Sequence, residues 1–177
     1  MKRRKLKLEE LNRITIDEFK ETEKIPLVVV LDNVRSQNNI GSVFRTSDAF
    51  LVEEIILCGI TATPPNTEIH KTALGAEDSV NWRYFEDTLT ALNRLKAEGY
   101  IIYSIEQTEN SKSLESLQIY KNKKYAIILG HEVHGVMQEV INSSDGCIEI
   151  PQYGTKHSLN VSVTAGILIW DFFKQLH

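Results

Sequence analysis

An amide-rich loop that leads to an arginine is the first group of residues in this chain with the types and spacing to do chemistry. The loop covers residues 33–39 and ends at Asn39, a residue type that caps helices. Arg45 then falls about a turn and a half into the helix expected over 39–50. A guanidinium in such a place can clamp a phosphate with two parallel hydrogen bonds, although a capped helix with a surface arginine has the same sequence pattern.

Two later segments place glycine and polar residues directly after apolar runs. In residues 128–136 two glycines flank Glu132, and such a turn leaves backbone amides and carbonyls free to meet a ligand. In residues 150–166 either Ser158 or Asn160 is suited to cap the last helix, which has a face of small residues that a ligand could approach closely. Taken singly, each segment is also an ordinary turn before a helix.

The elements that must position these segments are apolar runs of strand length that alternate with helical stretches. Strands are expected at residues 27–31, 54–58, 81–85, 100–105, 125–129 and 147–150, and helices at 39–50, 87–98, 136–142 and 159–176. Most of the runs are apolar at every position, which is typical of strands buried on both faces of a mainly parallel sheet. The sequence therefore predicts an α/β fold with helices covering both faces of the sheet. In such sheets ligands lie beyond the carboxyl ends of the strands, where the three polar segments begin.

Composition and charge are those of a globular protein with one compact domain. Of the 177 residues, 42% are hydrophobic and 25% are charged, and the formal net charge is −4. Five of the first seven residues are basic, which leaves −9 on the remainder. We expect a basic N-terminal arm with a helical extension over residues 1–25 and one domain over residues 26–177. The acidic body argues against nonspecific wrapping of nucleic acid, but not against a local basic site to which the arm contributes.

Cysteine content and hydropathy predict a cytoplasmic protein that has no contact with a membrane. Cys58 and Cys147 each lie in an apolar run and are expected to be buried free thiols. No apolar stretch approaches the about 18 residues that a membrane-spanning helix needs. No hydrophobic segment follows the basic N-terminus, so a secretion signal is not expected either.

Missing motifs exclude several nucleotide and metal sites. The chain has no G-x-x-x-x-G-K-[ST] loop, and Gly41 is the first glycine after the strand expected at 27–31, so the usual dinucleotide-binding turn is also absent. His131 and His134 are three positions apart, whereas a zincin helix needs histidines four positions apart. We therefore expect no metal site.

Together, the three polar segments resemble the motifs of the SpoU (TrmH-type) RNA 2′-O-ribose methyltransferases of the SPOUT superfamily. The first motif is matched by Asn39, Gly41, Arg45, Thr46 and Phe50. The second motif is matched by Gly130, Glu132, Gly135 and Val136, and the third by Ile150, Pro151, Gly154, Ser158, Leu159, Asn160, Val161 and Ser162. The motifs stand in the family's order between residues 27 and 173. Two positions depart from the pattern, with His131 where Asn or Ser is usual and Gln152 where Met is usual.

The resemblance implies a fold, a cofactor and an assembly. Members of this family have a C-terminal trefoil knot, a rare exception among protein chains, and they work as homodimers with the active site at or near the subunit interface. They bind S-adenosylmethionine and release S-adenosylhomocysteine, without a metal. Matching the motifs residue by residue predicts cofactor contacts, mostly through backbone atoms, from Gly130, Ile150, Ser158 and Leu159, with Ile105 or Glu106 added at the end of the strand at 100–105.

The resemblance also implies the reaction and the roles of the catalytic residues. A ribose 2′-hydroxyl of RNA attacks the methyl group of the cofactor, so the protein mainly supplies alignment. In the family the motif arginine, here Arg45, is the proposed general base, but a guanidinium does not give up its proton in proteins, and we expect Arg45 to be essential as a clamp on an RNA phosphate. The residues expected to orient Arg45, the ribose and the cofactor loops are Asn39, Glu132, Asn160 and Ser162.

The expected substrate is tRNA, because a short domain without a separate RNA-binding module can only read a nearby, prefolded feature. The same reaction on rRNA is an alternative. A second alternative is a catalytically inactive, knotted RNA-binding protein, although Asn39, Arg45 and Glu132 are all present. Related knotted enzymes that methylate a base nitrogen lack the first motif.

Overall fold

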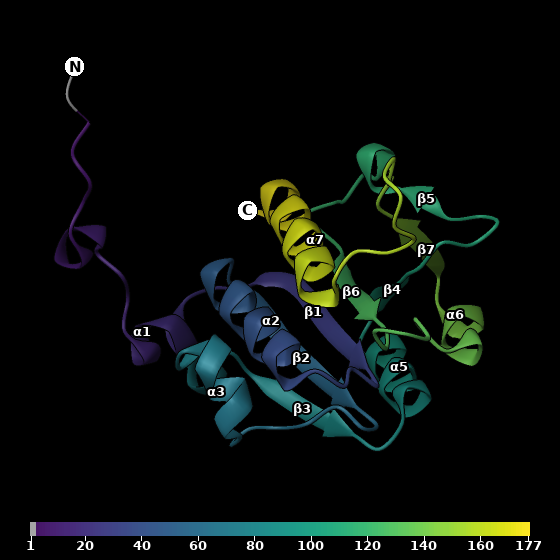
Figure 1. The fold of residues 1–177 in the computed structure, drawn as a ribbon, viewed down its shortest axis with the longest axis horizontal. Helices are drawn as coiled ribbons and strands as arrows, with labels where there is room; N and C mark the ends of the chain where they lie inside the picture. The colour runs from purple at the N-terminus through teal and green to yellow at the C-terminus, as the bar shows by residue number, and fades with distance from the viewer. Residues whose placement is uncertain (1–2) are drawn as a thin grey trace.

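One sheet of parallel strands forms the centre of the protein, whose computed structural model describes residues 3–177 (Figure 1). Within those residues the sheet has seven strands in the order β3-β2-β1-β6-β4-β7-β5, and every pairing between neighbours is parallel. The strands are β1 (Ile25–Asp32), β2 (Val52–Cys58), β3 (Trp82–Phe85), β4 (Tyr100–Ile105), β5 (Lys112–Ser113), β6 (Lys124–Leu129) and β7 (Gly146–Glu149). The predicted α/β class with a mainly parallel sheet is confirmed.

Helices cover both faces of this sheet, as the apolar runs predicted (Figure 1). On one face lie α1 (Ile16–Glu21), α2 (Gln37–Ala49), α3 (Thr67–Ala73), α4 (Ala76–Ser79) and α7 (Val161–Leu176). On the other face lie α5 (Thr88–Ala97) and α6 (Gln138–Ser143). Two short 3₁₀ helices, η1 (Leu8–Leu11) and η2 (Leu114–Ser116), complete the described elements.

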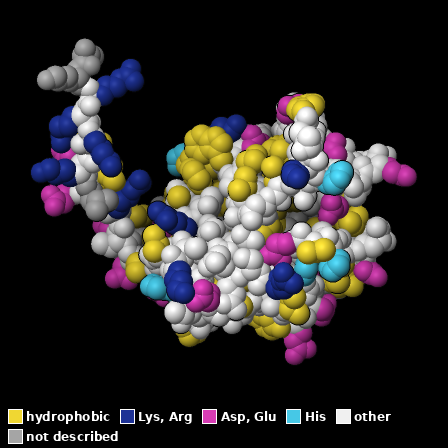
Figure 2. Space-filling model, viewed as in Figure 1, with side chains coloured by type: hydrophobic (Ala, Val, Ile, Leu, Met, Phe, Trp, Pro, Cys, Tyr) yellow, Lys and Arg dark blue, Asp and Glu magenta, His cyan; other side chains and the backbone are white. Residues whose placement is uncertain are grey.

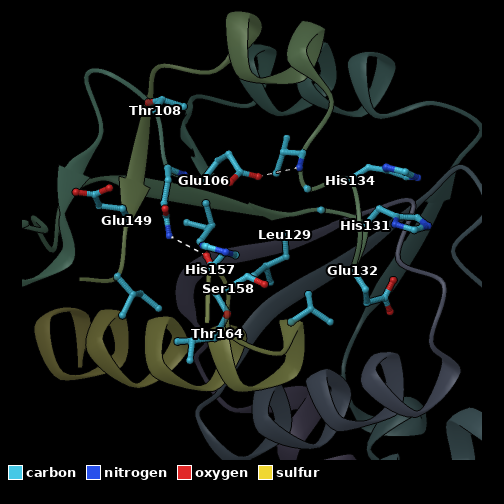
Figure 3. Close-up of a pocket in the computed structure, with 18 of the residues that line it drawn as sticks. Glu106, Thr108, Leu129, His131, Glu132, His134, Glu149, His157, Ser158 and Thr164 are labelled. Atoms are coloured by element: carbon cyan, nitrogen blue, oxygen red, sulfur yellow. Dashed lines mark hydrogen bonds between the residues drawn. The ribbon is translucent and has the colours of Figure 1, made fainter. Parts of the chain in front are cut away.

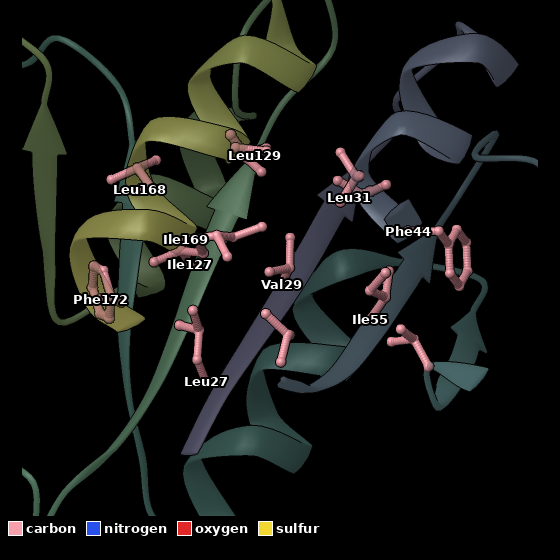
Figure 4. Packing of buried hydrophobic residues seen from close by; sticks show 14 of the residues in the cluster. Leu27, Val29, Leu31, Phe44, Ile55, Ile127, Leu129, Leu168, Ile169 and Phe172 are labelled. Carbon is pink, nitrogen blue, oxygen red and sulfur yellow. The ribbon is translucent and has the colours of Figure 1, made fainter. Parts of the chain in front are cut away.

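Alternate residues of β1 divide between the two hydrophobic cores. Leu27, Val29 and Leu31 pack on the side of α2 and α7, where Figure 4 shows them, and Val28 and Val30 pack on the side of α5. All five side chains are fully buried. Because successive side chains of a strand point to opposite faces, a strand that is apolar at every position has to be covered on both.

The structure differs from the sequence prediction at the start of α2 and after β2. Helix α2 begins at Gln37, and the side chain of Ser36 caps it by accepting a hydrogen bond from the backbone N–H of Asn39. The predicted cap at Asn39 is therefore wrong, because Ser36 is an equally suitable cap one turn earlier. Helices α3 and α4 are missing from the prediction, since each is short and has few apolar residues. At α7 the cap is Asn160, one of the two residues predicted.

The N-terminal segment extends away from the body of the protein (Figure 1). Its helix α1 begins at a capping box in which Thr15 and Glu18 bond reciprocally. Lys2, which belongs to the predicted basic arm, lies outside the described residues. Across residues 3–177, none of the helices has the length and apolar character needed to cross a membrane. Both cysteines are buried free thiols, as predicted.

Gly41 of the first motif lets α2 pack tightly against α3. A Cβ at this position would lie 2.2 Å from the carbonyl oxygen of Ile69 and 2.2 Å from Oγ1 of Thr72. The carbonyl belongs to a helix backbone and cannot move aside alone. At Gly154, in the segment before α7, in contrast, a Cβ would meet no atom within 4 Å. Gly41 therefore has a packing role that Gly154 lacks.

We expect Gly41→Ala to lower the free energy of unfolding by about 1–3 kcal/mol, because the added methyl group forces α2 and α3 apart. The control Gly154→Ala should instead raise the free energy of unfolding by about 0.4–1 kcal/mol, since alanine has less conformational freedom than glycine in the unfolded chain. Urea unfolding followed by circular dichroism measures both changes. Equal effects of the two substitutions would contradict the packing role of Gly41.

Candidate active site

A cavity of about 720 Å³ lies at the carboxyl ends of β4, β6 and β7, next to the first turn of α7 (Figure 3). This volume is within the range of sites for small molecules and cofactors. The cavity is lined by all six residues predicted to contact a cofactor: Ile105, Glu106, Gly130, Ile150, Ser158 and Leu159. They follow three different strands, and the parallel sheet brings them to one edge.

Glycines make the turn after β6 tight enough to form one wall of this cavity. His131 and Gly135 exchange two backbone hydrogen bonds, of 3.1 Å and 2.8 Å. A Cβ on Gly130 would lie 2.2 Å from the backbone carbon of Gly135, and Gly135 itself has a φ of +68°. Since side-chain-bearing residues rarely adopt that conformation, the turn depends on both motif glycines.

The imidazole of His131 supports the same turn. Its Nδ1 accepts a hydrogen bond of 3.0 Å from the backbone N–H of Val133, and its ring lies 4.8 Å from the ring of His134. An asparagine or serine side chain can accept a hydrogen bond from the N–H two residues on in the same way. His131 therefore makes a local contact of the kind that an Asn or Ser side chain can also make. Among the described residues, no group of three or more His, Cys, Asp or Glu side chains is placed to hold a metal ion.

Glu132 joins this turn to the loop before α2. Its carboxylate accepts hydrogen bonds from the backbone N–H groups of Arg35 (3.0 Å) and Ser36 (2.8 Å) and from Nδ2 of Asn39 (3.2 Å). Desolvation by itself raises the pKa of Glu132, but these hydrogen bonds outweigh it and hold the pKa below its ordinary value. The sequence gives no signal for the two backbone donors, because their side chains take no part.

The hydrogen bonds continue from Asn39 to the last helix. Oδ1 of Asn39 accepts a hydrogen bond of 3.3 Å from Nδ2 of Asn160. Oδ1 of Asn160 in turn accepts hydrogen bonds from the backbone N–H (2.9 Å) and the hydroxyl (2.6 Å) of Ser162. The structure therefore joins four of the five residues predicted to be catalytic in one network across the three motifs.

Arg45, the fifth of those residues, stands apart from the network. It is exposed on α2 and is not among the residues that line the cavity. Neither a hydrogen bond nor an ion pair joins its guanidinium to another residue in the described part of the chain. The structure thus leaves Arg45 outside the cavity, with all of its donors available.

Glu106 and Gln107 connect three walls of the cavity (Figure 3). The Glu106 carboxylate accepts hydrogen bonds from the backbone N–H groups of Gln107 (3.1 Å) and Val136 (3.2 Å). Nε2 of Gln107 donates a hydrogen bond of 3.3 Å to the carbonyl of His157. Sequence reasoning missed Gln107, since it lies outside the motifs and its partner is 50 residues away.

Comparison with known sequences gives one family and several relatives. The model of the SpoU rRNA Methylase family matches residues 26–170. A tRNA (guanosine(18)-2′-O)-methyltransferase of Thermus thermophilus is 30% identical over 166 residues, which cover 94% of this chain and 84% of that protein. An uncharacterized tRNA/rRNA methyltransferase of Borreliella burgdorferi is 32% identical over 163 residues, which cover 92% of this chain and 69% of that protein.

Solved structures match over most of the chain. An rRNA methyltransferase of Sinorhizobium meliloti with bound AdoMet has a TM-score of 0.80 at 25% identity, and the match covers 90% of this chain and 60% of that one. A TrmH/SpoU tRNA modifying enzyme of A. aeolicus has a TM-score of 0.79 at 24% identity, covering 90% of this chain and 81% of that one. The second likeness concerns the fold alone.

We expect Glu132→Gln to loosen the join between the turn after β6 and the loop before α2. Glutamine has only one acceptor oxygen, so a backbone N–H of Arg35 or Ser36 loses its partner, and the free energy of unfolding at pH 7 should fall by about 1 kcal/mol. Because folding lowers the pKa of Glu132, its stabilisation is fully present above the unfolded pKa of about 4.3 and is lost as the pH falls through the lower folded value.

Urea unfolding of the wild type and Glu132→Gln, at pH 7 and then at stepwise lower pH, measures this difference. It should shrink toward acid. A difference that grew at low pH would contradict the role given to the Glu132 carboxylate.

Proposed function

The chain belongs to the SpoU rRNA methylase family, and from this premise we propose that it transfers a methyl group from S-adenosylmethionine to a ribose 2′-hydroxyl of tRNA. The observation that carries the proposal is the hydrogen-bond network from Glu132 through Asn39 to Asn160 at the edge of the cavity. The relative from Thermus, by its name, supports both the ribose oxygen and the tRNA.

The cavity suits S-adenosylmethionine in volume and in the groups that it presents. When bound, this cofactor supplies a methyl group that its positive charge activates toward attack. Ile105, Ile150 and Leu159 offer apolar surface for a planar base, while Gly130 and Ser158 offer backbone and hydroxyl groups for polar contacts. The neighbour from Sinorhizobium, described with AdoMet bound, supports this assignment.

The proposed reaction asks the protein chiefly for alignment. The ribose oxygen bonds to the methyl carbon, the electron pair of the bond from that carbon to sulfur stays on sulfur to give S-adenosylhomocysteine, and the hydroxyl proton is released to the solvent. Alignment can lower such a barrier by about 7–11 kcal/mol. Asn39, Asn160 and Ser162 hold the ribose and the loops in place through the network that ends at Glu132. Arg45 binds an RNA phosphate with its fixed fork of donors and keeps its proton.

The active unit in this proposal is a homodimer with the active site at the subunit interface. Because Arg45 lies outside the cavity of its own subunit, a second copy is needed to bring an arginine to it. Helix α7 exposes Val163, Ile167 and Trp170 along one face, and Figure 2 shows hydrophobic side chains gathered over this helix. An exposed apolar strip of this kind is typical of a protein–protein interface.

We further propose that the chain between β6 and α7 is threaded as a trefoil knot. Strand β7 pairs with β4 on one side and β5 on the other, and both precede it in the sequence. Strand β7 therefore lies between two strands that precede it in the sequence, as a threaded chain requires.

We also propose that the protein is cytoplasmic, because buried cysteine thiols stay reduced in that compartment.

We propose that the N-terminal arm, within residues 1–25, contacts RNA, because five of its first seven residues are basic whereas the remainder of the chain carries a net charge of −9. Arg3, Arg4, Lys5 and Lys7 are exposed there, and Figure 2 shows basic side chains along this segment. Arg4 is paired with Glu10 at 2.7 Å. Each phosphate that such side chains neutralise adds affinity by releasing counterions.

Methyl transfer from labelled S-adenosylmethionine to total tRNA and to rRNA tests the proposal. Label in an alkali-resistant dinucleotide identifies the ribose 2′-oxygen, because a methylated ribose blocks alkaline cleavage. Label in a base would favour a methyltransferase that acts on a base nitrogen. Label only in rRNA would make rRNA the substrate instead of tRNA. Cofactor binding without transfer would favour an inactive RNA-binding protein.

We expect Arg45→Ala to reduce methyl transfer by at least about a hundred-fold, because the RNA is no longer held in line with the methyl group. Binding of S-adenosylmethionine should be unchanged, since Arg45 does not line the cavity. Arg94→Ala is the matched control, because Arg94 is an exposed arginine of α5 on the opposite face of the sheet, paired with Glu98. Equal loss of cofactor binding and transfer in Arg45→Ala would contradict the assignment.

Subunit mixing tests whether Arg45 acts in the partner's site. Arg45→Ala and Gly130→Ala should each be inactive alone. The first variant lacks the arginine, and in the second the added methyl group distorts the turn after β6. After mixing and exchange, mixed dimers carry one intact site, so activity should return to about a quarter of the wild-type value. If Arg45 acted in its own subunit's site, the mixture would stay inactive.

A further inference from the structure

The ionisable side chains that line the cavity are glutamates and the three histidines His131, His134 and His157. Three glutamates line it, Glu106, Glu132 and Glu149, and neither lysine nor arginine occurs among the described residues that do so. Charges in such a cavity interact more strongly than in water, because the effective dielectric constant is lower. The charge of a bound ligand therefore matters for its affinity.

Of these three glutamates, Glu106 lines the cavity directly after β4, and its carboxylate is held toward the backbone N–H of Val136 (Figure 3). Its carboxylate is held by the backbone N–H groups of Gln107 and Val136. The carboxylate also lies directly against the turn after β6, where a Cβ on Gly135 would come within 2.2 Å of Oε2 of Glu106. Each carboxylate oxygen can accept two hydrogen bonds and accepts one here, so each oxygen keeps one acceptor site.

The other two glutamates are placed differently. Glu132 is occupied by three N–H donors on the side of α2. Glu149 lies at the end of β7, at the edge of the cavity, and its carboxylate points away from the centre (Figure 3). Glu106 is thus the carboxylate available to a ligand in the cavity.

We infer that Glu106 makes the cavity selective for the positively charged methyl donor over its neutral product, an inference that rests on the proposed function. S-Adenosylmethionine has a sulfonium, an ammonium and a carboxylate, and so one positive charge in excess. S-Adenosylhomocysteine has the same parts except the sulfonium charge, so every other contact is shared. The carboxylate of Glu106 attracts the first ligand more than the second, and the product leaves the site more readily than the donor.

Titration calorimetry of the full chain with each of the two ligands tests this inference, and sinefungin is a third ligand, in which a protonated amine replaces the sulfonium. We expect the wild type to bind S-adenosylmethionine at least about ten-fold more tightly than S-adenosylhomocysteine, with sinefungin on the side of the donor. In Glu106→Gln the preference should fall below about three-fold. Glu149→Gln removes the same charge at the cavity edge and should leave the preference within about two-fold of the wild-type ratio.

The ratio of the affinities for S-adenosylmethionine and S-adenosylhomocysteine distinguishes a role of Glu106 in selecting the charged ligand from a role in supporting the turn after β6. If Glu106→Gln weakened both ligands equally, Glu106 would only hold the turn, and the inference would be overturned. Equal binding of both ligands by the wild type would overturn the inference but leave the proposed function standing. A wild type that bound neither ligand would overturn the proposed function as well.

Discussion

The carboxylate of Glu132 is the contact on which the geometry of the site depends. It binds the N–H groups of Arg35 and Ser36, which stand at the N-terminus of α2, where the unpaired N–H groups of a helix attract negative charge. The same carboxylate binds Asn39, whose other side-chain atom reaches the cap of α7. One anion therefore fixes the turn after β6 against two helices that begin more than a hundred residues apart in the chain.

Several residues of the family motifs maintain the structure of the site. Gly41 makes room for the carbonyl of Ile69, and Gly130 and Gly135 close the turn after β6. His131 departs from the usual residue types but still accepts the local hydrogen bond that supports this turn. The motif pattern thus reports the shape of the backbone as much as the groups that face a ligand, and a substitution that keeps the local hydrogen bond keeps the turn.

Sequence reasoning predicted the sheet because its signal is local: a run such as Leu27–Leu31, apolar at every position, has to be covered on both faces. The six residues that the family resemblance predicted to contact a cofactor line one cavity, since parallel strands end at one edge of the sheet. Sequence reasoning failed where a contact depends on a residue that is distant in the sequence. Ser36 and Asn39 are both good caps, and the partner that draws the Asn39 side chain away, Glu132, is 93 residues distant. The link from Glu106 to Val136 likewise joins loops that only the folded sheet brings together.

The positions of the charged side chains indicate different binding places for the two substrates of the proposed reaction, the methyl donor and the RNA. A cavity lined by glutamates without lysine or arginine among its described residues suits a cation and repels a phosphate. The RNA backbone therefore has to be bound elsewhere, and the basic groups are elsewhere: Arg45 is exposed on α2, and the N-terminal arm extends from the body. In such an arrangement RNA phosphates do not compete for the cofactor cavity, and the methyl group is the part of the donor that has to meet the RNA. The exposed guanidinium of Arg45 and the glutamates of the cavity thus lie at different places on the protein, and in the proposed homodimer the second subunit would bring the two together.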